Sequence, residues 1–121
     1  MLVVRGTKKL RDRVKGPPAG DDDASTTALG DWFATALFWR PQVALLVNRR
    51  TLLPVLTELA PAETLLDRVP NAIEAVLRRH RVEGGFLAAE RDAMDEVRIG
   101  PTDDRSVVGV MNEFALHGGI L

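Results

Sequence analysis

The residues best suited to recognition lie close to the C-terminal end of the sequence, in a predicted helix over residues 105–116. At about 100° per residue, Arg105, Gly109 and Asn112 fall on one side of this helix, and Glu113 lies beside them. Glycine inside a helix costs about 1 kcal/mol relative to alanine, so Gly109 favours the close approach of a partner helix, a strand or a ligand. The alternative is a solvent-exposed stripe in which the glycine has no function.

The other side of the same helix is apolar, and we expect it to face the core. Its residues recur at the spacing of one helical face: Val107, Val108, Met111, Phe114 and Ala115. Packing of this side would leave the stripe of Arg105, Gly109 and Asn112 on the outside, available to a partner.

Asp31 and the two histidines are the other groups that could take part in chemistry. Asp31 begins a predicted helix, where a carboxylate ordinarily accepts hydrogen bonds from first-turn N–H groups. It could also form an ion pair with Arg105. His80 follows two arginines at a predicted helix C-terminus, and neither His80 nor His117 has the spacing of a metal site. The sequence therefore predicts no metal site and no cofactor, and the catalytic residues, if any, stay unknown.

Basic side chains raise a second possibility, a surface for nucleic acid. The candidates are Lys8, Lys9, Arg11, Arg49 and Arg50. They would share one face only if the first strand lay beside a hairpin over residues 43–56. Nucleic-acid surfaces often add exposed aromatic side chains for stacking, whereas the tryptophans here fall in a segment predicted to be buried. Nucleic-acid binding is therefore the weaker prediction.

The composition limits the class of protein. The chain has 121 residues, of which 45% are hydrophobic, and a formal net charge of −1, which suits one globular domain. It has no cysteine, which excludes disulfides, thiolate metal sites and cysteine nucleophiles. No apolar run approaches the roughly 18 residues of a membrane span, and no signal-peptide pattern is present, so we expect a cytoplasmic protein. Arginine outnumbers lysine by thirteen to three, which is typical of a GC-rich bacterial genome.

One apolar run connects Asp31 with Phe38 and Trp39. Residues 31–39 are predicted to form a helix that is apolar nearly all round and is therefore buried on several sides or covered by a partner. Pro41 would end this helix, because the residue before a proline avoids the helical region. The apolar surface around Phe38 and Trp39 is the first reason to expect self-association.

The rest of the pattern predicts one α+β domain over residues 1–121, with a small, mainly antiparallel sheet of three to four strands and four to five helices. Strands are expected at residues 2–4, 43–47, 52–56 and 98–100, the third of them at an edge because Pro54 cannot donate to a ladder. Further helices are expected at residues 8–15, 61–81 with a restart or kink at Pro70, and 86–96. Residues 16–26 are rich in glycine, proline and aspartate and are predicted to be a mobile loop.

Three sequence blocks resemble a family of small uncharacterised bacterial proteins. The blocks are R-G-T-K-K-L at residues 5–10, L-G-D-W-F-A at residues 29–34, and D-R-S-V-V-G-V-M-N-E-F-A at residues 104–115. The last block is the most specific one, and Asp104 stands where this family usually has asparagine. The resemblance covers nearly the whole chain and implies a stand-alone domain of unknown function. It implies no activity.

Together these observations predict a non-catalytic binding or assembly module, expected to be a homodimer and to have an unidentified protein partner, with no membrane contact. Its contact residues would be Asp31, Phe38, Trp39, Arg105, Gly109, Asn112 and Glu113. The alternative is a nucleic-acid-binding protein or a metal-independent ribonuclease of the toxin type, in which Arg105 or His80 would contact the phosphate.

Overall fold

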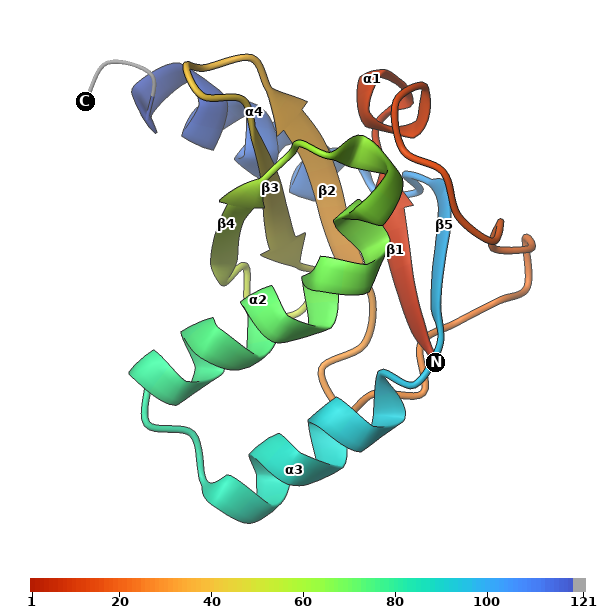
Figure 1. Cartoon of the computed structure of the whole chain (residues 1–121), viewed down its shortest axis with the longest axis vertical. Helices are drawn as coiled ribbons and strands as arrows, with labels where there is room; N and C mark the ends of the chain where they lie inside the picture. Colours follow the sequence, from red (N-terminus) through yellow and green to blue (C-terminus); the bar gives the residue numbers. More distant parts are fainter. Residues whose placement is uncertain (119–121) are drawn as a thin grey trace.

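A computed structural model describes residues 1–118, with side chains as far as Leu116, and shows one five-stranded sheet with helices on both faces (Figure 1). The strands lie in the order β4-β3-β2-β1-β5. They are β1 (Leu2–Gly6), β2 (Trp32–Leu37), β3 (Val43–Asn48), β4 (Pro54–Glu58) and β5 (Val97–Pro101). The helices are α1 (Lys8–Arg11), α2 (Leu65–Arg79), which follows a 3-10 turn, η1 (Ala62–Thr64), then α3 (Gly84–Ala93) and α4 (Arg105–Gly118). No helix in this part of the chain is long and apolar enough to cross a membrane.

The α+β class is confirmed, but the prediction of a mainly antiparallel sheet of three to four strands is wrong. β2, β3 and β4 are antiparallel neighbours, whereas β1 is parallel to both β2 and β5. Parallel neighbours require a crossover that returns the chain to the starting end of the sheet. A long irregular segment makes this return before β2, and α2 with α3 makes it before β5.

The strand that the sequence analysis missed is β2, in the segment that was predicted to be a helix. Trp32–Leu37 is β2, and all six of its residues are buried. A helix that is apolar all round and a strand that is buried on both faces give the same pattern, and at this length periodicity cannot separate them. Trp32 and Ala34 face one helical layer, while Phe33 and Leu37 face the other. Phe38 and Trp39 therefore follow the central strand rather than lie on a helix.

Two separate apolar clusters hold the helices to the sheet. On one face, α2 and α3 pack on a large cluster that includes Val4, Trp32 and Ile73. On the opposite face, α4 packs on a smaller cluster that includes Phe33, Leu45 and Met111. Figure 1 shows α2 and α3 on one side of the sheet and α4 on the other. The sheet is thus covered by helices on both faces around β2 and β3.

The terminal helix largely has the orientation that the sequence predicted. Val107 and Met111 are buried against β2 and β3, and Val108 and Ala115 are partly buried beside them. Phe114 differs, because 37% of its surface is exposed although it was expected to lie in the core. The helix predicted over residues 105–116 extends to Gly118, and the side chain of His117 lies outside those that the structure describes.

Helices α2 and α3 each differ from the prediction. α2 continues through Pro70 without interruption from Leu65 to Arg79. α3 begins at Gly84 rather than at Phe86, because the carboxylate of Glu83 accepts hydrogen bonds from the N–H groups of Gly85 and Phe86. This N-cap offsets the low helix propensity of the two glycines.

The segment 16–26 is irregular, as predicted, and is hydrogen-bonded at both of its ends. Ile99 N–H donates to the carbonyl of Pro17 and Ala19 N–H donates to the carbonyl of Ile99, so the segment starts along the outer edge of β5. At its other end Thr26 N–H donates to the carbonyl of Met1. Between these ends Asp23 and Ser25 also bond to Arg5, Arg98 and Val3 of the sheet, and the mobility of the segment stays a prediction.

The orientation of α4 gives a first test. Met111→Ala should lower the free energy of unfolding by about 2–5 kcal/mol, because Met111 is fully buried and the change leaves a cavity. Phe114→Ala should cost less than about 2 kcal/mol, because much of the ring already contacts water. Urea denaturation of both variants at low protein concentration measures the difference. Equal losses would contradict the packing of this helix.

Candidate functional site

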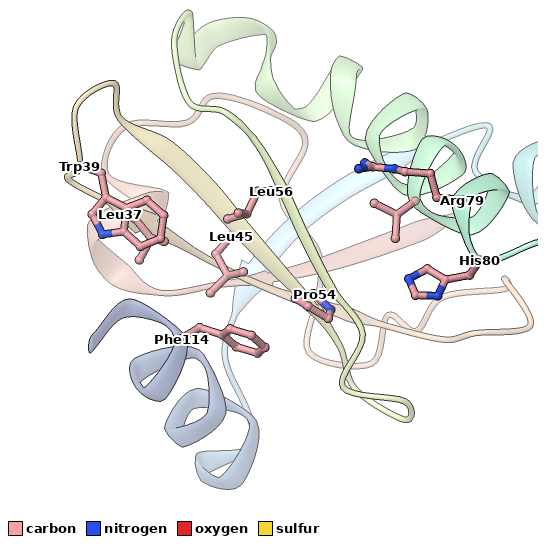
Figure 2. Close-up of a pocket in the computed structure, with 9 residues that line it drawn as sticks. Leu37, Trp39, Leu45, Pro54, Leu56, Arg79, His80 and Phe114 are labelled. Atoms are coloured by element: carbon pink, nitrogen blue, oxygen red, sulfur yellow. The ribbon is translucent and has the colours of Figure 1, made fainter. Parts of the chain in front are cut away.

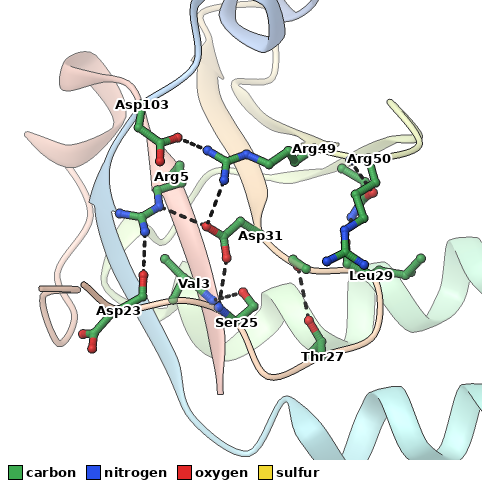
Figure 3. Close-up of polar contacts among 12 residues, drawn as sticks. Val3, Arg5, Asp23, Ser25, Thr27, Leu29, Asp31, Arg49, Arg50 and Asp103 are labelled. Atoms are coloured by element: carbon green, nitrogen blue, oxygen red, sulfur yellow. Dashed lines mark hydrogen bonds and ion pairs between the residues drawn. The ribbon is translucent and has the colours of Figure 1, made fainter. Parts of the chain in front are cut away.

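Asp31, the carboxylate that the sequence singled out, lies in a buried network of charges (Figure 3). Its side chain is 7% exposed, and Arg5 Nε donates to its Oδ2 over 3.2 Å. Arg49 Nη1 lies 3.8 Å from the same oxygen, and Ser25 N–H donates to Oδ1 over 3.0 Å. The prediction of a helix cap is wrong, since Asp31 precedes a strand, and its partners are these two arginines rather than Arg105.

The two arginines are fixed by further contacts. Arg5 Nη2 donates to the carbonyl of Asp23 over 2.7 Å, and Arg49 pairs with Asp103 while its guanidinium lies 5.1 Å from the centre of the Phe33 ring. Gly100 leaves room for Arg5, because an added Cβ there would lie 3.2 Å from Arg5 Nη1. Asp31 joins the two arginines, and each arginine has a further acceptor, although the buried Nε of Arg49 has no hydrogen-bond partner. The geometry is that of a structural network.

The pKa of Asp31 depends on the balance between its burial and the hydrogen bonds and charges around it. Burial opposes ionisation of the carboxyl group, but hydrogen bonds from Ser25 and Arg5 and the charge of Arg5 outweigh it and lower the pKa. A pKa that falls on folding stabilises the folded state above the ordinary carboxyl pKa, near 4. This stabilisation is lost as the pH falls through the lower pKa of the folded protein.

A groove lies where α4 and the edge strand β4 meet, and the sequence did not predict it (Figure 2). We call it the β4–α4 groove. Its volume is about 440 Å³. Leu56 is 54% exposed in it and Phe114 is 37% exposed. Its lining is mainly apolar, and two basic residues at the end of α2 complete it. The lining residues are Leu37, Trp39, Leu45, Pro54, Leu56, Val76, Arg79, His80 and Phe114.

One sequence signal could have revealed the groove. An edge strand usually carries polar side chains on a face that meets water, yet Leu56 is apolar and lies on the face opposite to buried Val55. The expected core position of Phe114 concealed the second half of the groove. Of the predicted contact residues, the structure therefore brings Trp39 into this groove together with Leu56 and Phe114.

The predicted stripe on α4 lies on the outer side of the helix, away from the sheet. Arg105, Gly109 and Asn112 line a shallow depression of about 510 Å³ with Thr102, Asp103, Asp104 and Val108. A Cβ added at Gly109 would meet nothing within 4 Å. The described part of the chain therefore does not approach Gly109. Glu113 is exposed on the same helix.

Phe38 lies in a different and basic setting. It is 55% exposed, Lys9 Nζ lies 5.8 Å from the centre of its ring, and Arg13 Cζ lies 5.9 Å from it. Arg13 also donates to Gln42, which joins the end of α1 to the loop after β2.

The predicted basic residues do not share one face. Arg49 and Arg50 follow β3, whose last residue, Asn48, pairs with the first residue of β2, whereas Phe38 follows the last residue of that strand. Lys8, Lys9 and Arg11 follow β1, which is parallel to β2, and Lys9 lies at Phe38. They are therefore separated from Arg49 and Arg50 by the length of β2. Among the described residues, no group of three or more His, Cys, Asp or Glu side chains could hold a metal ion.

Fold and sites together define a small α+β domain with a mixed five-stranded sheet, a buried ionic network and an apolar groove at one sheet edge. A family model described as "Domain of unknown function (DUF6933)" matches residues 3–119, and the chain belongs to this family. Comparison with curated proteins and with solved structures gives no match. The predicted membership of a family of unknown function is thereby confirmed.

The ionic network gives a second test. Asp31→Asn should lower the free energy of unfolding by about 3–5 kcal/mol, because it leaves the buried guanidinium group of Arg5 without its counter-charge. The control is Asp12→Asn, which breaks an exposed ion pair with Lys8 and should cost less than about 1 kcal/mol. The Asp31→Asn variant should also lose less stability than the wild type between pH 5 and pH 3. Equal effects of the two substitutions in urea denaturation would contradict the role of the network.

Proposed function

We propose that this protein is a non-catalytic binding and assembly module that acts as a homodimer, with the β4–α4 groove as its contact surface. The carrying observation is that Leu56 and Phe114 are both exposed and line the same groove as Trp39, so that a folded monomer would expose apolar surface to water there. Contiguous apolar surface of this kind usually marks an interface. A second copy is the occupant that fits, because the strand at the groove has open backbone groups that are complementary to themselves.

The polar groups support this reading as well. Arg5, Asp31 and Arg49, which have the residue types of a catalytic site, use their charges on one another inside the fold. The outer stripe of Arg105, Gly109 and Asn112 is separate from the groove and is a second contact surface for an unidentified protein partner. The composition, rich in arginine and free of cysteine, supports a bacterial and cytoplasmic setting for such a module.

Two phenylalanines of equal exposure provide the test. Phe114 and Phe86 are each 37% exposed, but Phe114 lines the groove and Phe86 lies on α3. Phe114→Glu should convert the dimer to a monomer, because it would bury a charge in an apolar contact. Phe86→Glu should leave the dimer intact. Sedimentation equilibrium at micromolar concentration measures both, and a wild-type mass equal to the 13.3 kDa of one chain would refute the proposal.

A second candidate function, binding of single-stranded nucleic acid, rests on Phe38. An exposed aromatic ring with Lys9 and Arg13 beside it combines a stacking surface with cations for phosphate. In the described chain, Lys9 and Arg13 form no ion pair with a carboxylate. His80 and Arg105, the residues expected for a ribonuclease, lie in the groove and on α4 rather than in this patch.

The second candidate predicts specific losses of affinity. Phe38→Ala should weaken binding of a labelled single-stranded RNA or DNA by about tenfold, because one stacking contact is lost. Lys9→Gln with Arg13→Gln should also reduce the slope of affinity against salt concentration. Arg50→Gln, at the other end of the sheet, serves as the control and should change nothing. Fluorescence anisotropy that detects no binding at 50 mM salt would exclude this function.

A further inference from the structure

The hydrogen-bond pattern of β4 determines which of its backbone groups face the open edge. Leu59 N–H donates to the carbonyl of Gln42, and Asn48 N–H donates to the carbonyl of Leu53. Hydrogen-bonded pairs in an antiparallel ladder alternate, so Val55 and Thr57 use their backbone groups on β3. The backbone groups of Pro54, Leu56 and Glu58 therefore point outward from the sheet.

Two of the outward-pointing backbone positions on β4 cannot form a hydrogen bond with a new partner. Proline has no N–H, so Pro54 presents a carbonyl alone. The carbonyl of Glu58 is already occupied, because Arg68 Nη1 donates to it over 2.7 Å. What is open at this edge is the N–H and the carbonyl of Leu56, the carbonyl of Pro54 and the N–H of Glu58.

These groups are complementary to those of a second copy in one register. If two β4 strands pair antiparallel with Leu56 opposite Leu56, each Leu56 N–H meets the carbonyl of the other. In the same register the Glu58 N–H of each copy meets the Pro54 carbonyl of the other. Pro54 has no N–H to donate, but the group opposite it is the Glu58 carbonyl, which already accepts from Arg68. Four hydrogen bonds therefore form between the two strands, and no backbone group at the contact lacks a partner.

The side chains are complementary in the same register. A two-fold axis perpendicular to the sheet places both Leu56 side chains on the α4 face, so the two β4–α4 grooves join into one apolar strip with Phe114 on each side. Glu58 of each copy lies opposite Pro54 of the other, next to which Arg79 and His80 line the groove. In the described chain Glu58 has no ion pair of its own.

We infer that two copies of this chain join through their β4 strands, antiparallel and with Leu56 on the two-fold axis, to form one continuous ten-stranded sheet. This inference rests on the proposed homodimer and adds its geometry. A shifted register would place the Pro54 ring or the occupied Glu58 carbonyl opposite groups that need a partner, so the edge permits this pairing and disfavours the others.

Cross-linking tests the register, because the chain has no cysteine of its own. In Leu56→Cys the two Cα atoms would lie about 5.5 Å apart across the axis, within the range of a disulfide. The matched control is Glu58→Cys, two residues along the same strand, where the two Cα atoms would lie about 14 Å apart. Mild oxidation should therefore give a disulfide-linked dimer of the first variant and at least tenfold less of the second.

A proline substitution tests the hydrogen bonds. Leu56→Pro removes an N–H that points away from β3, so the fold should survive, as edge strands tolerate proline at such positions. The dissociation constant of the dimer should rise at least about tenfold, because both central bonds lose their donors. Circular dichroism checks the fold, and sedimentation measures the dimer.

The possible outcomes separate this inference from the proposed function. A wild-type monomer would overturn both. If the wild type is a dimer but the Leu56→Cys variant does not cross-link, or the Glu58→Cys variant cross-links equally well, the β4 pairing is overturned and the homodimer stands. A Leu56→Pro protein that is folded and equally dimeric would also overturn the pairing.

Discussion

The burial of β2 on both faces is the constraint on which this structure depends. A central strand with Trp32 on one side and Phe33 on the other requires cover above and below the sheet. Within the described part of this 121-residue chain, three long helices are available for this purpose. Two of them cover the first face, and α4 alone covers β2 and β3 on the second. The rest of the second face, over β1 and β5 on one side and over β4 on the other, must be covered by something other than α4.

At β1 and β5 the second face is covered by the irregular segment between α1 and β2, residues 12–31, which ion pairs and hydrogen bonds hold in place. β1 extends beyond the start of β2, and there Ser25 Oγ accepts a hydrogen bond from Val3 N–H over 2.8 Å in place of a ladder partner (Figure 3). Arg5 binds this segment through Asp23 and Asp31, while Glu90 of α3 accepts hydrogen bonds from Ala28 and Leu29 at its far end. A loop has too little apolar surface to cover a sheet by itself, so buried ion pairs and hydrogen bonds fix it instead.

The sequence allowed part of this architecture to be predicted. The hairpin of β3 and β4 followed from its apolar runs, the edge position of β4 from Pro54, and the terminal helix from its 3.6-residue period. β2 could not be recognised, because its apolar pattern fits a buried helix as well as a strand with two covered faces. The choice between them depends on α2 and α4, which pack on β2 from distant parts of the chain.

The same limit applied to the candidate sites. Asp31 was correctly singled out as a residue of interest, but its partners lie 26 residues before it and 18 residues after it, and only the sheet brings Arg5 and Arg49 together around it. Gly109 was singled out for a local helix penalty, and the fold places nothing beside it. The groove needed Leu56 from one sheet edge and Phe114 from a helix that begins four residues after the opposite edge strand. No spacing rule relates such residues.

At β4 the helical cover ends, and this is why we propose an interface there. α4 crosses β2 and β3 but leaves Leu56 half in water, so the edge strand has both an open backbone and an exposed leucine. Open edges of this kind favour uncontrolled pairing, and proteins usually block them with proline or charge. Here Pro54 and Arg68 block two positions and leave the groups between them free. An edge that only needed protection would have no use for an apolar residue at its centre. Partial blocking around Leu56 is what the proposed dimer would require, because it permits antiparallel pairing in one register and disfavours the shifted ones.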